Sequence, residues 1–266
     1  MKSIVPDLAE VTSVVREDTF LEVMPGAHCM IILRITDETP EKTSMSLVLG
    51  AESVVECVLV YDCTIVRTTS VVWHRELAGK AKLQTTIALV SNGTHALHRT
   101  TALATGGVLD EGEFFLGKEN QSFSLTHEVI NAAPNTKATV LTKGVLLDQS
   151  KAFCKGNMVI ASEACQSSSW LGQHVLLLSK DAKADAVPCL EIKNNDVKAY
   201  HAATVAPLDE QHLFYLTARG INLADARRMI AEAFLFPLTE RIAKLQVQEF
   251  LQRNIHSALE VKYVLA

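Results

Sequence analysis

The chain has 266 residues, of which 48% are hydrophobic and 21% charged, and its formal net charge is −5 at pH 7. A chain of this length can bury a proper core, as one large domain or two ordinary ones. Its densest basic spot is the pair Arg227-Arg228. This argues against nucleic acid as a partner, because phosphate binding depends on clustered cations.

The sequence predicts a cytoplasmic protein with no membrane partner. Residues 1–6 lack the apolar core of a secretory signal peptide. No segment approaches the ~18 uninterrupted apolar residues that a membrane-spanning helix needs. The cysteines are therefore expected to be thiols, and none form the C-x-x-C pair of a self-contained zinc site. They are Cys29, Cys57, Cys63, Cys154, Cys165 and Cys189.

Strands are predicted from about residue 11 to residue 205. This part of the chain is rich in Val, Ile, Leu and Thr, in short runs that are broken by Gly, Asn, Asp or Ser. No good amphipathic helix fits within it. The clearest runs are 46–49, 57–61, 85–90, 138–141, 158–160 and 175–178.

Two all-β arrangements fit these runs. An antiparallel sandwich or barrel normally shows Asn-Gly or Asp-Gly turns, and only Asn92-Gly93 qualifies cleanly. A parallel β-solenoid stacks short strands coil upon coil, and we favour it. Apolar residues recur at intervals of 16 to 19, which suits one short coil per repeat: Val140, Val159, Leu176 and Ile192.

The apolar pattern changes to helical spacing after these strands. Asp209 is placed to cap a first helix and Gly220 to end it, and Asn222 is placed to cap a second. Pro237 is expected to kink or divide the second helix, which then continues over about 238–259. We expect the helices to pack beside the end of the solenoid and to cap its last coil, which otherwise leaves an unpaired edge.

Several motifs in a fixed order link the strands to the helices. They are Pro188-Cys-Leu-Glu-Ile192, Asn195-Asp-Val-Lys198, His201-Ala-Ala-Thr-Val205 and Leu213-Phe-Tyr-Leu-Thr-Ala-Arg-Gly-Ile221. Over about residues 176–234 the chain resembles the SufB/SufD family of iron–sulfur cluster assembly proteins, and the SufD branch in particular. Before residue 151 the resemblance is vague.

The resemblance implies a mainly β fold, a right-handed parallel β-helix over 1–207 with a C-terminal helical domain over 208–266. It implies a scaffold rather than an enzyme, in the SUF machinery. The β-helix is expected to pair with a SufB-type subunit or with a second copy, and the helices to dock a SufC-type ABC ATPase. A transient iron–sulfur cluster is implied, and no nucleotide bound by this chain itself.

The chain departs from the family in two ways. Family members usually carry an N-terminal helical region, whereas this chain is expected to start at or near the β-helix. A short or divergent member, or one that lost that region, is implied. SufB proteins also have a cluster-building cysteine where this chain has Gln173, and acidic residues where it has Tyr200 and Ala202. The SufD role, offering one histidine to a site that a partner completes, is therefore expected.

His201 and Cys189 are the candidate residues for cluster assembly and the interface. An imidazole can ligate iron or carry a proton near neutral pH, and a thiolate is an apt iron ligand. His201 is accordingly a candidate ligand of iron, or of a cluster, that is shared with a partner. The alternative is a structural histidine packed by Tyr200 and a cysteine that acts as a small core hydrophobe.

The candidate ATPase-docking residues are Arg227, Phe234 and Phe236. Phe234, Leu235 and Phe236 are consecutive large apolar residues, and we expect that they cannot all face one core.

The remaining histidines are interpreted as structural. His95 and His98 should point to opposite faces of one strand and cannot share a metal. His74, His127, His174 and His212 have no partner at a useful spacing.

Two other functions stay open at this stage. One is a β-helix enzyme that acts on polysaccharide, which needs paired carboxylates in a groove. The other is a structural family member that has lost the cluster chemistry.

Overall fold

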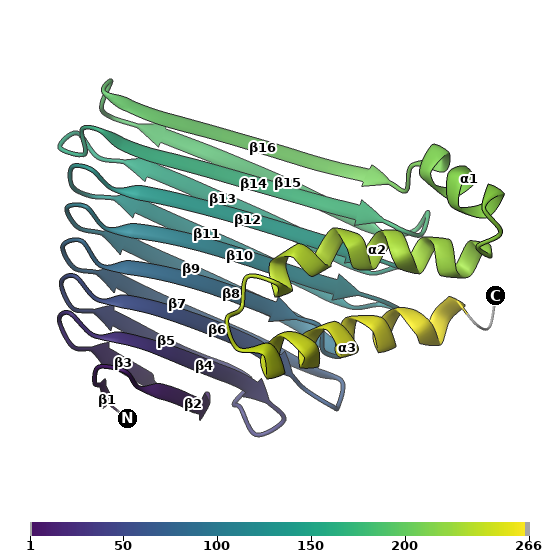
Figure 1. The fold of residues 1–266 in the computed structure, drawn as a ribbon, viewed down its shortest axis with the longest axis horizontal. Coiled ribbons are helices and arrows are strands. Elements are labelled where there is room, and N and C mark those ends of the chain that lie inside the picture. The colour runs from purple at the N-terminus through teal and green to yellow at the C-terminus, as the bar shows by residue number, and fades with distance from the viewer. Residues whose placement is uncertain (1, 264–266) are drawn as a thin grey trace.

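The computed structural model describes residues 2–263 and contains two parallel sheets followed by three helices (Figure 1). Successive strands alternate between the sheets, so each coil gives one strand to each. The odd sheet contains β1 (Lys2–Val5), β3 (Thr19–Val23), β5 (Lys42–Leu49), β7 (Arg67–Leu77), β9 (Gly93–Leu103), β11 (Ser122–Asn131), β13 (Lys151–Ile160) and β15 (Lys183–Ile192). The even sheet contains β2 (Glu10–Val14), β4 (His28–Thr36), β6 (Val54–Asp62), β8 (Lys82–Leu89), β10 (Val108–Gly117), β12 (Lys137–Leu146), β14 (Ser167–Leu177) and β16 (Val197–Pro207).

The predicted parallel solenoid is confirmed, and the sandwich is wrong. Neighbouring strands run parallel and in register, so that like positions stack from coil to coil. One inward row joins Val71, Leu97, Leu125 and Cys154, each at most 1% exposed. Because side chains alternate between the two faces of a strand, each row along the stack is either wholly inside or wholly outside.

The predicted coil length is wrong. Val140, Val159, Leu176 and Ile192 lie on four successive strands, β12 to β15, which alternate between the sheets. Their spacing of 16 to 19 is therefore half a coil. A contact between stacked coils, such as Glu119 N–H to Asp148 Oδ2, joins residues 29 apart in the sequence.

The corners from an odd strand to the next even strand, from β1–β2 to β13–β14, each hold one residue in the left-handed region. The φ angles are +60° at Glu52, +61° at Lys80, +69° at Gly106 and +61° at Asn135. The amide of Lys80 donates to the carbonyl of Thr105 in the coil above, at 2.8 Å. Gly and Asn suit this conformation, whereas Glu and Lys adopt it at a steric cost. The backbone conformation of the corner is thus determined by stacking between coils more than by residue type.

The helices are α1 (Glu210–Ala218), α2 (Leu223–Thr239) and α3 (Leu245–Tyr263). The predicted caps are confirmed. The Asp209 carboxylate accepts from the amide of Gln211, and the Asn222 side chain accepts from the amide of Asp225, both at 2.8 Å. Gly220 has a φ of +87°. Pro237 lies inside α2, which ends two residues later.

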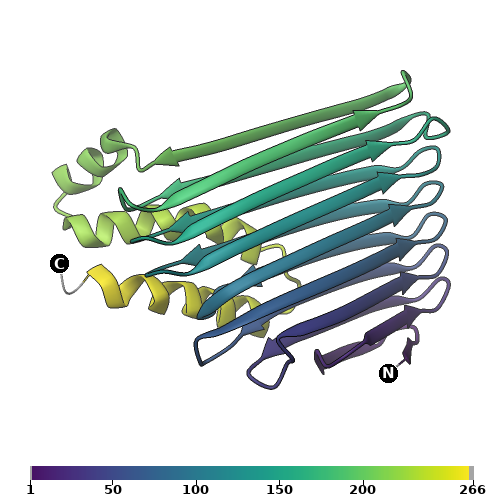
Figure 2. The same cartoon turned by 180° about the vertical axis from the view of Figure 1, so that it is seen from behind.

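We had expected the helices to cap the last coil, and this expectation is wrong. In Figure 1, α2 and α3 lie across the outer face of the even sheet. They share a second core with the even-sheet strands β6, β8, β10 and β12. This core is formed by Val58, Val60, Ala88, Phe114, Leu116, Val145, Leu147, Ala231, Leu235, Leu238, Ile242, Leu251, Ile255 and Leu259. Seen from behind in Figure 2, none of the three helices covers the odd sheet.

The strands end at Pro207 and the first helix begins at Glu210. The division into domains over 1–207 and 208–266 stays a prediction. Residues 1 and 264–266 of those ranges lie outside the described part. None of the helices within 2–263 is long and apolar enough to cross a membrane.

Candidate functional site at the open end of the solenoid

His201 lies in the middle of β16, the last strand of the even sheet. Its ladder partner on β14 is Leu171, which is 1% exposed and belongs to the inner core. His201 therefore stands on an inward-facing row. It is nevertheless exposed, because β16 pairs with β14 on one edge and with no strand of residues 2–263 on the other. The structure thus presents the imidazole at the open mouth of the solenoid.

Cys189 lies on β15, the last strand of the odd sheet. Its ladder partner is Asn157, and the next residue, Met158, is buried in the inner core. Because alternate residues face opposite ways, Asn157 and Cys189 stand on the outer face. The Cys189 side chain is half-buried, and Sγ lies 3.9 Å from the Val187 carbonyl. His201 and Cys189 thus lie on different sheets and opposite faces, and the structure does not bring them together.

The open end exposes apolar side chains on both sheets. Tyr200 is 63% exposed, Ile192 47%, and Val187 and Val205 39% each. The open end also carries charge, since Lys193 Nζ lies 2.8 Å from Glu191 Oε1. Large apolar side chains beside a strand edge are typical of an interaction surface.

The two open strand edges differ in their hydrogen-bonding groups. In a strand, successive backbone groups point alternately to the two neighbours. On β15 the amides of Lys183 and Lys193 donate to β13 and its flank, at 3.1 and 2.9 Å. The alternate residues therefore face the open edge, and one of them is Pro188, which has no N–H. The β15 edge is thus interrupted at its centre.

The β16 edge has no such interruption. The carbonyl of Asp196 accepts from the amide of Gln166 at 2.7 Å, so even-numbered residues face β14. The odd-numbered residues up to Val205 then present N–H and C=O groups to the open edge: Val197, Ala199, His201, Ala203 and Val205. An unpaired row of this kind is a template for pairing with another chain.

Gln173 lies inside the solenoid, one coil below the open end. It is 3% exposed on β14, between Thr142 of β12 and Ala203 of β16 in the ladder. Its Oε1 has no hydrogen-bond partner among the described residues. The interior position at which the resemblance implies a cysteine in SufB proteins therefore holds an amide, not a thiol, in this chain.

Within residues 2–263, no group of three or more His, Cys, Asp or Glu side chains could hold a metal ion. The six cysteines are free thiols, as predicted.

The helix α1 contributes no buried side chain. Phe214 is 74% exposed and Tyr215 57%, and the Arg219 guanidinium carbon lies 5.0 Å from the centroid of the Tyr215 ring. The start of α2 continues this surface with Leu223, 50% exposed, and Met229, 43% exposed. We call these exposed residues of α1 and early α2 the helical patch.

The predicted docking residues are less exposed: Arg227 lies between Leu223 and Met229, and Phe234 and Phe236 lie farther along α2. Arg227 is half-buried, and its Nε has no partner within the described chain. Phe234 and Phe236 are half-buried and pack against the second core, around the fully buried Leu235. All three consecutive residues therefore contact one core, contrary to our expectation. Lys143 Nζ donates to the Phe234 carbonyl at 2.9 Å.

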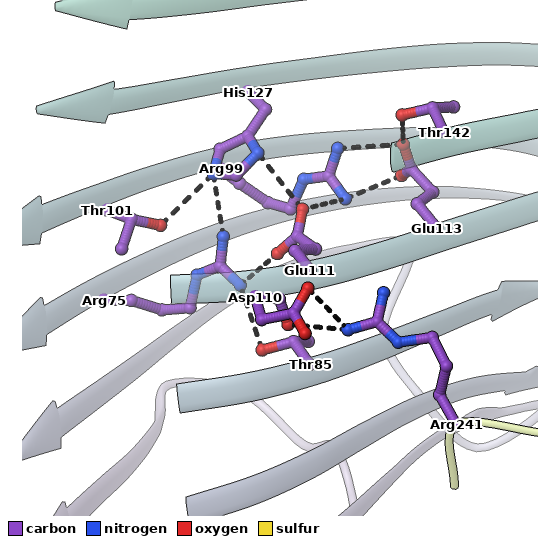
Figure 3. A network of polar contacts seen from close by, with 10 residues as sticks. All are labelled: Arg75, Thr85, Arg99, Thr101, Asp110, Glu111, Glu113, His127, Thr142 and Arg241. Carbon is purple, nitrogen blue, oxygen red and sulfur yellow. Dashed lines mark hydrogen bonds and ion pairs between the residues drawn. The ribbon is translucent and has the colours of Figure 1, made fainter. Parts of the chain in front are cut away.

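The sequence reasoning missed a network of charged side chains inside the solenoid (Figure 3). Glu111 of β10 forms ion pairs with Arg75 and with Arg99, whose Nη1 lies 3.2 Å from Oε1. His127 Nδ1 lies 3.1 Å from the same oxygen. These four side chains are at most 3% exposed.

Its neighbours fix the tautomer of His127. Nε2 lies 2.9 Å from Arg75 Nη2 and 3.2 Å from Thr101 Oγ1. A guanidinium can only donate, so Nε2 accepts and the ring proton sits on Nδ1, facing Glu111. Burial lowers the pKa of His127 to about 4. The ring is therefore neutral at pH 7.

Glu113 completes the network. Its carboxylate lies 2.7 Å from Arg99 Nη1 and accepts from Thr142 Oγ1 at 3.0 Å. Burial alone would raise the pKa of Glu111, but Arg75, His127 and Arg99 hold it well below its ordinary value. Two arginines then balance two glutamates. Glu111 and Glu113 are at most 1% exposed, so this carboxylate pair does not face a substrate groove.

No local sequence signal marks this network. Its ionisable members come from four strands, Arg75 of β7, Arg99 of β9, Glu111 and Glu113 of β10 and His127 of β11. Parallel register places Arg75, Arg99 and His127 on neighbouring strands of the odd sheet, and the two glutamates face them from the even sheet. The one available clue is Arg or Glu at positions where the strand alternation expects an inward apolar residue.

The predicted opposite orientation of His95 and His98 is confirmed, since His95 is buried and His98 is exposed.

The chain matches a known protein family over most of its length. A family model described as "SUF system FeS cluster assembly, SufBD core domain" matches residues 8–234. The iron–sulfur cluster assembly protein SufD of Bacillus subtilis is 28% identical over 180 residues, which are 66% of this chain and 41% of that protein. SufD of Escherichia coli is 39% identical over 102 residues, 38% of this chain and 24% of that protein.

A SufBD family protein of Mycobacterium tuberculosis H37Rv is 34% identical over 141 residues, 50% of this chain and 36% of that protein. The match thus spans less than half the length of each of these relatives. The family model, in contrast, covers most of this chain and includes the solenoid from β2 onward, α1 and most of α2. The chain belongs to the SufB/SufD family of the SUF iron–sulfur cluster assembly system, and it is SufD-like.

Proposed function

We propose that this chain is a SufD-like scaffold subunit that pairs, through the open end of its solenoid, with a SufB-type subunit or with a second copy. It turns over no substrate and binds no nucleotide itself, and it works in the cytoplasm. The observation that carries the proposal is His201, exposed on an inward-facing row at a strand edge that is open for pairing.

His201 supplies half of a site in this proposal. A neutral imidazole nitrogen is a good iron ligand, but one histidine cannot hold a cluster alone. A partner strand laid along the β16 edge would bring its own side chains to the mouth of the solenoid. A partner thiolate there would share a transient cluster with His201. Cys189, on the outer face of β15, is proposed as an interface residue at the rim of this contact.

The helices are proposed to dock a SufC-type ABC ATPase. The helical patch supports this, because α1 exposes two large aromatic rings and buries nothing. Arg227 lies on the adjoining part of α2 and is proposed to border the contact. Phe234 and Phe236 would take part through the portions that the second core leaves uncovered.

The cluster role is tested by replacing His201 with Ala and measuring the maturation of an iron–sulfur enzyme in cells that depend on this chain. We expect a loss of at least about tenfold, because no other side chain at the mouth replaces the nitrogen ligand. His98→Ala is the matched control, since His98 is exposed on the outer face of the odd sheet. Normal maturation in H201A cells would instead indicate a structural family member without cluster chemistry.

The docking role is tested by copurification of the chain with a SufC-type ATPase. Phe214→Ser combined with Tyr215→Ser should abolish copurification, because both rings belong to the helical patch and are 74% and 57% exposed. The control is Ile65→Ser with Val66→Ser, which removes exposed apolar side chains, 58% and 81% exposed, from a solenoid loop. Equal loss in both double variants would refute a specific site on the helices.

A further inference from the structure

Among the buried N–H groups inside the solenoid that lack a hydrogen-bond partner, three also take no part in the ion-pair contacts described above. They are the indole Nε1–H of Trp73, the Nε–H of Arg75 and the Nε–H of Arg99, none of which finds a partner within the described residues. Each of these residues is at most 1% exposed. Nearly all buried donors in folded proteins are paired with a protein group or an ordered water, so these three need a common explanation.

The three side chains form one cluster. The Arg75 guanidinium carbon lies 4.7 Å from the centroid of the Trp73 ring. Trp73 of β7 is the direct ladder partner of Arg99 on β9. Both guanidinium groups also reach the Glu111 carboxylate (Figure 3). One small ligand can therefore serve more than one of these donors.

The charge of the cluster decides which ligand fits. Arg75 and Arg99 are already balanced by Glu111 and Glu113, and His127 is neutral. A bound anion would leave an uncompensated negative charge in an interior that solvent does not reach, which is strongly unfavourable. The ligand must accept hydrogen bonds and be uncharged. It must also donate in turn, and the carboxylates of Glu111 and Glu113 are acceptors within the same network.

We infer that Trp73, Arg75 and Arg99 form a binding site for an ordered water molecule in the interior of the solenoid. Buried waters of this kind make about three hydrogen bonds to polar groups that otherwise lack partners. The water would accept from the indole and from a guanidinium Nε, and donate to a network carboxylate. The inference does not depend on the proposed function.

The test is a crystal structure of the full chain at about 1.5 Å resolution. We expect a water peak roughly 2.7–3.2 Å from Trp73 Nε1 and from the Nε of Arg75 or Arg99. Trp73→Phe removes one donor and should abolish the peak or displace it. His74→Phe is the matched control, because it places the same ring on the outer face of the same strand and should leave the peak unchanged.

Two further measurements cover the other outcomes. A bromide soak with anomalous data should show no bromide at the site. A bromide peak there would contradict the inference, because it would show that the site binds an anion. In solution, water ¹⁷O magnetic relaxation dispersion should count one fewer long-lived internal water in W73F than in the wild type. A wild-type structure in which protein atoms satisfy all three donors would overturn the inference.

Discussion

Glu111 is the residue on which most of the buried charge converges, because Arg75, Arg99 and His127 all contact its carboxylate. Glu111→Gln should lower the free energy of unfolding by about 3–5 kcal/mol, since it leaves buried guanidinium charge without its counter-ion. Urea unfolding followed by circular dichroism measures this.

The control for this change is Glu52→Gln. Glu52 forms an ion pair with Lys80 at 3.0 Å, but the two side chains are 65% and 73% exposed. An exposed pair contributes at most about 1 kcal/mol. If E111Q cost no more than E52Q, the buried network would be far weaker than its geometry indicates.

His127 makes the stability of the fold depend on pH. Its pKa is about 4 in the folded chain, because burial disfavours the charged ring, and His95 behaves in the same way. The unfolded chain binds these protons near pH 6.5, so the stabilisation is complete above that pH and is lost as pH falls toward 4. Each histidine should contribute a loss of roughly 3 kcal/mol over this interval.

The measurement is the free energy of unfolding at pH 7, 6, 5 and 4.5. His127→Gln should flatten the pH dependence, whatever its effect at pH 7, because the side chain no longer takes up a proton on unfolding. His95→Gln should flatten it in the same way, because burial lowers the pKa of His95 to about 4 as well. A wild-type slope in H127Q would show that His127 is not the group responsible.

At the scale of the elements, the helix caps have unequal consequences. Asn222 caps α2, whose Ala226, Ala231 and Leu235 are fully buried. Asn222→Ala should therefore lower the free energy of unfolding by about 1 kcal/mol, because the amide of Asp225 loses its acceptor. Thermal unfolding measures the change as a lower melting temperature.

Asp209→Ala provides the comparison. It removes the same kind of cap from α1, which has no buried side chain. The melting temperature should stay within error of the wild type, while α1 alone frays and its amides exchange faster with deuterium. A fall in melting temperature equal to that of N222A would mean that α1 is integral to the fold.

At the scale of the whole molecule, the two open edges should not be equivalent in assembly. Ala203→Pro removes an N–H from the uninterrupted β16 edge without touching the ladder to β14. It should weaken pairing with the partner chain about tenfold or more, because the partner carbonyl loses its donor and meets the proline ring. Analytical ultracentrifugation or surface binding to the SufB-type subunit measures this.

Ala186→Pro is the matched change on the β15 edge. The amide of Ala186 faces the open side, where Pro188 already interrupts the row of donors. Affinity for the partner should therefore change little. Loss of pairing in A186P with normal pairing in A203P would reverse the assignment of the interface from the even sheet to the odd sheet.

Some of this structure could be predicted because the signals are local. The caps of α1 and α2 depend on Asp209, Asn222 and Gly220 and on their immediate neighbours. The strands follow from β-branched runs between turn residues. The coil length could not be predicted in this way, because inward apolar residues recur on every strand and do not reveal which sheet a strand joins. The spacing therefore gave half of the true period.

For the candidate site too, some features have local sequence signals and others depend on the folded structure. The sequence alone identified His201, and placed it at the change from strand to helix, through motifs that are contiguous in the chain. Only the tertiary structure decided that His201 faces the mouth of the solenoid while Cys189 faces outward on the other sheet. It also decided that Arg75, Arg99, Glu111, Glu113 and His127 meet. The physical reason is that stacking joins residues a whole coil apart and the interior joins residues of the two facing sheets, and both relations exist only in the folded chain.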